Sequence, residues 1–321
     1  MRDHGGNIDG AKALFGGADA DWIDLSTGIN RVPYNIPQLS DTAWQSLPTR
    51  AAIGRLTAAA AHAYRCTAGI LPVAGAQAAI QMIPRLGRPG QARVLAPTYN
   101  EHAACLRAAG WRVEDVSQVQ DLIGADLAVV VNPNNPDGRE TTPTALMELS
   151  RKVGQLVVDE SFGDARPDLS VAPDIEEAEN LFVLRSFGKF YGLAGLRLGF
   201  VLSCMKNINQ LTEMSGPWPV SGLAIEVGEK ALLDSDWATK TIDRLRGEIT
   251  HMDAIASATD WEVLGGTELF RLYRTPDATC AQERLAKSQI WSRIFPWSPH
   301  LIRLGLPGTM HEWTRLQEAL R

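Results

Sequence analysis

Cysteine, positive charge and long apolar runs are all scarce in this chain of 321 residues. No two of the four cysteines (Cys66, Cys105, Cys204 and Cys280) form a Cys-x-x-Cys pair, so their spacing indicates neither a zinc cluster nor a disulfide framework. Lysine and arginine number 31 against 37 aspartates and glutamates, which gives a formal charge of −6. That balance argues against non-specific binding to nucleic acid or to an anionic membrane surface.

Segments that could anchor or export the chain are missing too. The longest apolar runs, such as Leu127–Val131, are far too short to span a bilayer. The opening residues, MRDHGGN, contain no apolar core of the kind found in signal peptides. We therefore expect a protein of the reducing cytoplasm that has neither a membrane nor a nucleic acid as its partner.

Hydrophobic residues make up 45% of the chain and charged residues 21%, an ordinary globular balance that excludes a disordered chain. Apolar runs typical of buried strands alternate with stretches of helical period. Strands are predicted at 93–96, 111–116, 127–131, 156–158, 181–184, 261–264, 269–273, 290–295 and 301–304. Helices are predicted at 51–64, 76–86, 223–233, 237–255, 278–287 and 311–320. The pattern predicts an α/β fold with a mostly parallel sheet between helices, followed by a smaller α+β domain.

Three parts of the chain are expected from this organisation. Residues 1–40, rich in glycine, are predicted to form an arm that contributes to the small domain and the active site. Residues 41–230 are predicted to form the large domain, and residues 231–321 the small C-terminal domain. No linker of low complexity separates the two domains, so they are expected to pack closely.

Lys189 is the most informative candidate residue. It follows a predicted buried strand and has Phe187 and Phe190 as sequence neighbours. Apolar surroundings disfavour the charged form of an amine, and a neutral amine near pH 7 is the form that Schiff-base chemistry requires. Ser186 and Arg197, on either side, could bring a hydroxyl and a guanidinium to one phosphate.

The segment SFGKFYGLAGLRLG at 186–199 resembles the lysine motif of the fold-type-I pyridoxal-phosphate enzymes, the aspartate and histidinol-phosphate aminotransferase superfamily. Three other segments are similar to motifs of the family and follow in its order: GAQ at 75–77, NPNNPDG at 132–138 and VVDESF at 157–162. The resemblance implies a pyridoxal 5′-phosphate cofactor. It also implies a seven-stranded type of large-domain sheet and a homodimer.

The resemblance assigns catalytic roles to Lys189, Asp159 and Tyr99. Lys189 would hold the cofactor, Asp159 would pair with the pyridine nitrogen, and Tyr99 would stack on the ring. Asn135 would donate a hydrogen bond to the ring 3′-oxygen. From the residues alone, Asp159 is more often an ordinary loop aspartate, and a turn former is an equal alternative for Asn135.

The cofactor phosphate would lie at the start of a predicted helix. Gly75, Ala76 and Gln77 open that helix, where free backbone N–H groups attract an anion. The resemblance places His102 in support of Asp159, and a surface histidine is the alternative.

Arginines near the C-terminus indicate an anionic substrate. Arg303 lies in an otherwise apolar predicted strand, where a charged side chain needs an anion. By resemblance it binds the substrate carboxylate. Arg293 is a second candidate anion ligand, and a strand residue that faces water is an equal alternative for it.

The arm narrows the resemblance further. HGGN at 4–7, WIDLSTGINRVP at 22–33 and RLGLPG at 303–308 resemble segments of the threonine-phosphate decarboxylases of cobalamin biosynthesis. That resemblance implies loss of CO2 from L-threonine O-3-phosphate, which gives (R)-1-amino-2-propanol O-2-phosphate. The candidate substrate-binding residues are His4, Gly5, Gly6, Asn7, Asn30, Arg293 and Arg303. A frayed terminus is the alternative for residues 4–7.

Two positions depart from the family pattern, and two other functions stay open. Phe162 and Leu47 stand where many relatives have tyrosines, one near the ring 3′-oxygen and one that reaches the neighbouring subunit's cofactor phosphate. An aminotransferase of the histidinol-phosphate type would use the same cofactor residues. A non-catalytic regulator on this fold would need a DNA-reading module with a basic face, and the sequence contains no such segment.

Overall fold

The computed structural model describes residues 4–321, which divide into two compact units. The large unit comprises Tyr34–Asn135 and Arg139–Ala238. The small unit comprises residues 4–33, Pro136–Gly138 and Thr239–Arg321. Within residues 4–321, no helix combines the length and the apolar character that crossing a membrane requires.

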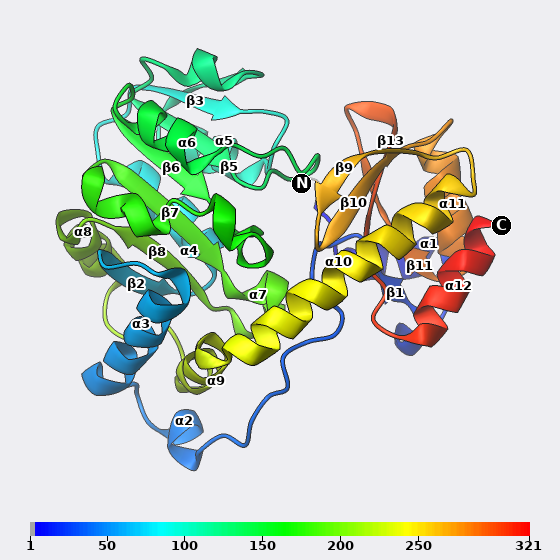
Figure 1. The fold of residues 1–321 in the computed structure, drawn as a ribbon, viewed down its shortest axis with the longest axis horizontal. Coiled ribbons are helices and arrows are strands. Elements are labelled where there is room, and N and C mark those ends of the chain that lie inside the picture. The colour runs from blue at the N-terminus through cyan, green and yellow to red at the C-terminus, as the bar shows by residue number, and fades with distance from the viewer. Residues whose placement is uncertain (1–3) are drawn as a thin grey trace. The chain divides into compact units, whose positions relative to one another are not determined.

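A seven-stranded sheet forms the centre of the large unit (Figure 1). Its strands in spatial order are β2 (Gly69–Val73), β8 (Gly199–Ser203), β7 (Leu181–Ser186), β6 (Gln155–Asp159), β5 (Leu127–Val131), β3 (Gln91–Leu95) and β4 (Arg112–Val116). Strand β8 is antiparallel to both of its neighbours, whereas all pairs from β7 to β4 are parallel. This confirms the predicted mostly parallel sheet.

Burial along the strands follows their place in the sheet. Every residue of β5 and β8 is buried, as continuous apolar strands with cover on both faces should be. Strand β2 is also buried and contains Pro72; as an edge strand it tolerates a residue without an N–H group. Strand β4, at the other edge, has only exposed and half-buried residues.

Four helices of the large unit begin at side-chain caps. The side chains of Ser40, Thr49, Thr142 and Ser221 each accept a hydrogen bond from the first turn of the helix that follows. The helices are α2 (Asp41–Gln45), α3 (Arg50–Tyr64), α4 (Ala76–Met82), α5 (Glu101–Ala108), α6 (Pro143–Ser150), α7 (Phe187–Phe190), α8 (Met205–Ser215) and α9 (Gly222–Leu233). The helix predicted at 76–86 ends as an α-helix at Met82 and continues as a 3-10 turn at Ile83–Arg85.

The small unit has an antiparallel sheet and a separate parallel strand pair. The four-stranded sheet has the order β12 (Arg293–Phe295), β13 (Ser298–Gly305), β10 (Phe270–Arg274) and β9 (Glu262–Thr267). The pair consists of β1 (Ile23–Asp24) and β11 (Ile290–Trp291). The helices are α1 (Ile8–Phe15), α10 (Ser235–Ser257, in this unit from Thr239), α11 (Ala278–Lys287) and α12 (Met310–Leu320). The predicted smaller α+β part is confirmed.

The prediction of a single strand at 290–295 is wrong, because the structure has two strands there. The segment predicted as one strand at 290–295 is interrupted at Ser292. Its first part, β11, pairs with β1 of the arm, and its second part, β12, pairs with β13. Because apolar periodicity does not reveal the pairing partner of a strand, the sequence could not show this break.

The N-terminal arm has regular structure and buried residues of its own. It contains α1 and β1, and the side chains of Ala11, Trp22 and Leu25 are buried. Backbone hydrogen bonds from Ile23 and Leu25 to carbonyls beside and within β11 attach it to the small unit.

Candidate active site

A cavity of about 160 Å³ lies in the large unit where the carboxyl ends of parallel strands meet. Such edges are the usual place for ligand sites in α/β sheets. Its lining residues are Ala76, Gln77, Ile80, Tyr99, Val131, Asn135, Asp159, Ser161, Phe162, Ser186, Lys189 and Arg197. Eight of the ten predicted cofactor residues therefore line one cavity, and Gly75 and His102 do not: the eight are Ala76, Gln77, Tyr99, Asn135, Asp159, Ser186, Lys189 and Arg197.

The Asp159 carboxylate is held by two neighbours. Oδ2 accepts a hydrogen bond from His102 Nε2 at 2.7 Å, and Oδ1 accepts hydrogen bonds from the backbone N–H, at 2.9 Å, and the hydroxyl of Ser161. Burial alone would raise the pKa of Asp159, but the hydrogen bonds from His102 and Ser161 outweigh it, so this pKa lies below the usual aspartate value. The site therefore keeps a negative charge at the end of β6.

Lys189 lies in the single turn of α7, directly after β7. Its Nζ is 5.6 Å from the centre of the Phe162 ring, in a cation–π arrangement. Phe187 and Phe190, its neighbours in sequence, are buried. The phenylalanine that replaces the family's tyrosine thus faces the amine with a ring and no hydroxyl.

The turn into α4 is packed closely against Arg197. Gly75 has φ +77°, and a Cβ on it would lie 2.5 Å from Arg197 Nη2. Gly199, at the start of β8, is equally confined, because its Cβ would lie 2.5 Å from the N atom of Ala76. Only glycine fits these two positions, and the result is a backbone turn with a guanidinium against it.

Tyr99 is joined to the same helix. Its Oη donates to Gln77 Oε1 at 3.3 Å, and Gln77 Nε2 donates to Glu101 Oε2 at 3.1 Å. Burial, with the nearby carboxylates of Glu101 and Asp159, raises the pKa of Tyr99 to about 12. The phenol therefore stays protonated at neutral pH.

A second cavity, of about 520 Å³, lies within the small unit. It brings together arm residues and one predicted arginine: His4, Gly5, Asn7 and Arg293. Gly6 is not among its lining residues, and its N–H donates to Ser26 Oγ at 2.7 Å. The Asn7 side chain caps α1 through Gly10 N, so the arm is ordered here.

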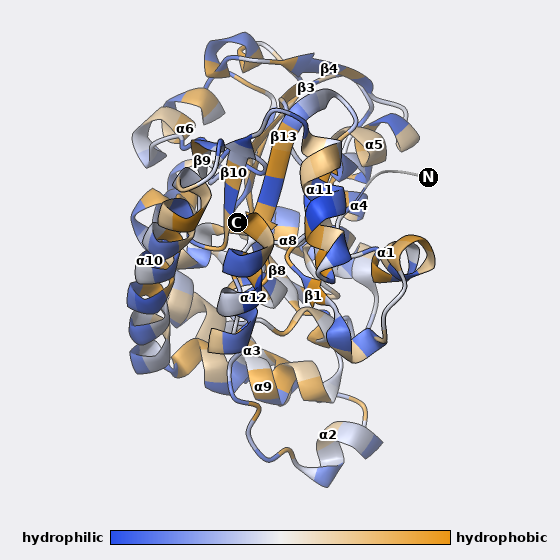
Figure 2. Ribbon diagram, turned by 90° about the vertical axis from the view of Figure 1, so that its right-hand side faces the viewer, coloured by the Kyte–Doolittle hydropathy of each residue, from blue (hydrophilic) through white to orange (hydrophobic). Residues whose placement is uncertain are grey.

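Arg293 and Arg303 stand directly opposite each other across the β12–β13 pair. Arg303 is 6% exposed, and its Nη2 donates to the carbonyl of Ser26 at 2.6 Å. Figure 2 shows the apolar end of β13 interrupted by a hydrophilic segment. Burial, with the charge of Arg293 added, lowers the pKa of Arg303 to about 9. Like charges directly opposite each other are unfavourable, so this pair is suited to an anion.

Asn30 is engaged elsewhere in the small unit. It is buried, and its Oδ1 accepts hydrogen bonds from Val32 N at 3.0 Å and from Arg244 Nη2 at 2.8 Å. Arg244 is also paired with Glu248. The predicted substrate residue is therefore fixed in place by a neighbouring arginine.

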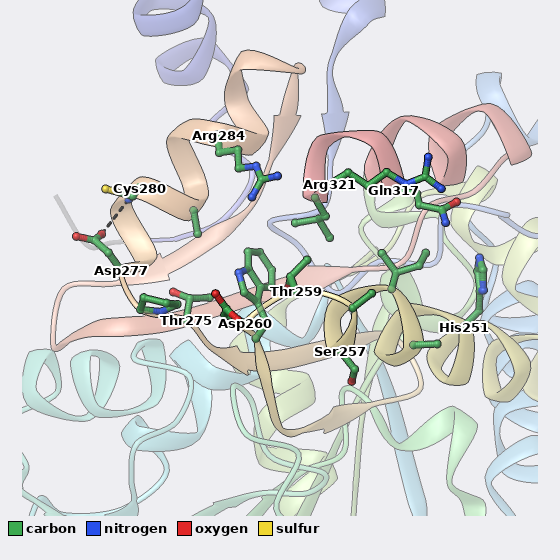
Figure 3. A pocket seen from close by; sticks show the side chains of 17 residues that line it. His251, Ser257, Thr259, Asp260, Thr275, Asp277, Cys280, Arg284, Gln317 and Arg321 are labelled. Carbon is green, nitrogen blue, oxygen red and sulfur yellow. Dashed lines mark hydrogen bonds between the residues drawn. The ribbon is translucent and has the colours of Figure 1, made fainter.

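A larger hollow, of about 1000 Å³, lies among α10, α11 and α12 (Figure 3). None of the predicted site residues lines it. Its rim mixes Arg284 and Arg321 with Asp260 and Asp277, and Asp277 caps α11 through Cys280 N. These features indicate no particular ligand.

Two serines that contact predicted site residues were not predicted from the sequence. Ser161 donates to Asp159, and Ser26 supplies the carbonyl that binds Arg303. An aspartate two residues before a serine is a common turn pattern, and this was the one available signal for Ser161. The contact through the carbonyl of Ser26 could not be predicted from the sequence, because every residue has a backbone carbonyl.

Comparisons with known proteins give close relatives over the full length. The chain is 42% identical to a threonine-phosphate decarboxylase from Sinorhizobium sp, over 99% of this chain and 97% of that protein. It is 39% identical to a threonine-phosphate decarboxylase from Pseudomonas aeruginosa, over 100% of this chain and 97% of that protein.

The fold and the family agree with these relatives. A solved histidinol-phosphate aminotransferase from Sinorhizobium meliloti, in complex with pyridoxal 5′-phosphate, superposes with a TM-score of 0.83 at 18% identity, over 97% of this chain and 93% of that one. The family model for aminotransferase class I and II matches residues 21–319. The chain belongs to the class I and II aminotransferase family.

Proposed function

We propose that this protein is a pyridoxal-phosphate enzyme that decarboxylates L-threonine O-3-phosphate to (R)-1-amino-2-propanol O-2-phosphate and CO2, a step of cobalamin biosynthesis. Two relatives of nearly equal length that carry the name threonine-phosphate decarboxylase support this choice. The structural observation that supports this function is that Arg293 and Arg303 lie opposite each other in the β12–β13 strand pair. Two guanidinium groups in register suit a substrate that carries a carboxylate and a phosphate.

The residues of the large-unit cavity fit the cofactor. It has an amine (Lys189), a carboxylate held in its ionised form (Asp159) and a glycine turn with a guanidinium against it (Gly75 and Arg197). In the same order, these groups match three parts of pyridoxal phosphate: its aldehyde, its ring nitrogen that takes a proton, and its phosphate. When bound, pyridoxal phosphate supplies an electron sink for the bond that breaks at Cα.

The predicted cofactor residues would hold the group as follows. Lys189 Nζ would bind the aldehyde, and Asp159, positioned by His102, would keep a proton on the ring nitrogen. Asn135 would donate to the ring oxygen, and Tyr99 would contact the ring. The turn 75–77, the hydroxyl of Ser186 and the guanidinium of Arg197 would bind the phosphate.

The small unit would bind the two anions of the substrate. Arg303 binds the carboxylate, while Arg293 and the arm residues 4–7 receive the phosphate. A carboxylate held equally well before and during bond cleavage lowers KM without raising kcat. The phosphate is remote from the breaking bond, so it is the better anchor, and it fixes the orientation of that bond.

The balance of the reaction requires a proton at Cα. The Cα–carboxylate bond breaks, CO2 leaves, and a proton takes its place on Cα. Lys189 Nζ is the group in the large-unit cavity that can hold and deliver this proton. The Phe162 ring lies beside this amine, 5.6 Å from Nζ to the ring centre.

Product analysis separates this function from an aminotransferase of the histidinol-phosphate type. Purified enzyme loaded with pyridoxal 5′-phosphate is incubated with L-threonine O-3-phosphate, and in parallel with histidinol phosphate and a keto acid. We expect the phosphorylated amino alcohol from the first mixture and no amino transfer in the second. Amino transfer from histidinol phosphate, with threonine phosphate unchanged, would show the alternative to be right.

We further propose a cytoplasmic homodimer. Large apolar side chains are exposed on the segment before α3, where Ile36, Trp44 and Leu47 are 54%, 69% and 64% exposed, and a second copy would cover them. All four cysteines are thiols, as a reducing compartment requires. A monomer that stays active at micromolar concentration in light scattering would contradict the dimer.

A further inference from the structure

We propose that the hydroxyl of Ser292 is a further phosphate-binding group of the small-unit cavity and that it receives the side-chain phosphate of the substrate. This inference rests on the proposed function for the identity of the ligand. It names a residue that neither the family pattern nor the sequence analysis above points to.

The hydroxyl of Ser292 is buried without a hydrogen-bond partner in the described part of the chain. Ser292 is 1% exposed, and its Oγ has no hydrogen-bond partner among the described residues. A buried hydroxyl without a partner is destabilising, and native structures rarely keep one unless a ligand or a water supplies the bond. Ser292 lines the small-unit cavity, so a ligand there can supply it.

The backbone around Ser292 is fixed from several sides. It lies between β11, paired with β1 of the arm, and β12, paired with β13. Gln282, on α11, donates its Nε2 hydrogen to the carbonyl of Ser292 at 2.8 Å. A side chain on a backbone fixed in this way has less freedom to lose when a ligand binds, which favours affinity.

The lining of the cavity identifies the ligand as an anion. Its described lining side chains include Arg293 and His4 but no aspartate or glutamate. Arg293 follows Ser292 directly and stands opposite the buried Arg303. A phosphate offers more acceptor oxygens than a carboxylate, and it can accept from a guanidinium and a hydroxyl together.

The first test measures the binding of inorganic phosphate to the pyridoxal-phosphate-loaded enzyme by calorimetry. We expect Ser292→Ala to weaken phosphate binding by about tenfold, the usual size for one hydrogen bond to a charged group. Ser292→Cys, which keeps the volume but donates weakly, should fall between the two. Phosphate affinity equal to that of the wild type in both variants overturns the proposal, because the hydroxyl then binds only a water.

Ser150→Ala is the matched control. Ser150 is also buried, but its hydroxyl donates to the carbonyl of Met147 at 2.8 Å. We expect this variant to lower the unfolding midpoint and leave phosphate affinity unchanged. Without ligand, Ser292→Ala should keep or raise the unfolding midpoint, since it removes a hydroxyl without a partner. A lowered midpoint with unchanged phosphate affinity would assign Ser292 a structural role instead.

The second test uses the substrate. Ser292→Ala should raise the KM for threonine phosphate about tenfold and leave kcat nearly unchanged, as expected for a contact kept throughout the reaction. Turnover of plain threonine should not change. If the wild type binds phosphate through Ser292 but releases no CO2 from threonine phosphate, the proposed function fails and the phosphate site stands. If the wild type releases CO2 and Ser292→Ala keeps the same KM, the site assignment fails and the function stands.

Discussion

At the scale of single residues, two contacts decide the charge of the Asp159 carboxylate. His102 and Ser161 donate hydrogen bonds to its two oxygens, and together they lower its pKa although the side chain is buried. A lowered carboxyl pKa leaves Asp159 ionised down to more acidic pH. If Asp159 pairs with the ring nitrogen as proposed, the acid limit of activity should depend on His102.

Replacing His102 should move that limit. In His102→Leu the hydrogen bond is lost and burial remains, so the pKa of Asp159 rises and the acid limb of the kcat/KM profile moves to higher pH. His102→Gln keeps an N–H donor and should show a smaller move. A profile with the same acid limb in wild type and His102→Leu would exclude this coupling.

Lys189 carries the second prediction at this scale. Lys189→Ala should abolish turnover and the visible absorbance that the cofactor gains when it is bound through lysine. The unfolding midpoint should stay near that of the wild type, since an amine and no core side chain is lost. Lys206→Ala, an exposed lysine on α8, is the control and should keep both signals. Near-normal turnover of Lys189→Ala would contradict the assignment.

At the scale of elements, the turn before α4 leaves no room for a side chain at Gly75. Gly75→Ala places a side chain at φ +77° and a Cβ 2.5 Å from Arg197 Nη2. A strained backbone position costs about 1–3 kcal/mol, so cofactor affinity should fall about tenfold or more.

The control for this prediction is Gly54→Ala in α3. A Cβ there would meet no atom within 4 Å, and alanine in a helix interior gains about 1 kcal/mol over glycine. This variant should be more stable and keep its cofactor, as a cofactor titration monitored by absorbance can show. Equal cofactor affinity of Gly75→Ala and the wild type would refute the role of the turn.

Elements were predictable from sequence where one pattern dominates. The run of five apolar residues at Leu127–Val131 gave β5 its observed bounds, and α11 also matches its prediction. Strands β2 and β8 and helices α5 and α8 were not predicted. Pro72 disguised β2, whereas β8 is an apolar run and α8 has apolar residues at every third position, so local patterns do indicate those two elements. The pairing of β11 with the arm depends on tertiary contacts that no local pattern contains.

The residues of the candidate site were also predictable only where a distinctive motif contains them. Residues inside distinctive motifs, such as Lys189, Asp159 and Arg197, were identifiable, and the structure places them around one cavity. Ser161 and Ser292 were not, because serine is common and its burial and partners appear only in the folded chain.

At the scale of the whole molecule, the two units hold different chemistry. The large unit has the cofactor-type cavity, and the small unit has the arm and the arginine pair. Deletion of residues 1–7, or Arg293→Ala, should therefore reduce kcat/KM for threonine phosphate by about tenfold to a hundredfold per lost charge-assisted contact. Residues 1–3 of that segment lie outside the described part of the chain.

Cofactor binding should survive both changes. Arg284→Ala, an exposed arginine of the small unit that lines the other hollow, is the matched control and should leave kinetics unchanged. Steady-state kinetics and cofactor titration on the same preparations check this. Equal losses in cofactor binding and in kcat/KM would contradict the division of roles between the units.

The proposed reaction of this enzyme is decarboxylation of an amino acid that it recognises by the side-chain phosphate. The most direct measurement is the release of labelled CO2 from carboxyl-labelled L-threonine O-3-phosphate, with labelled threonine as the paired substrate. We expect CO2 and the phosphorylated amino alcohol in equal amounts, and turnover of plain threonine lower by about a hundredfold or more, since the charge-assisted contacts to the phosphate are lost. A keto acid without CO2, or equal use of threonine and threonine phosphate, would contradict the account.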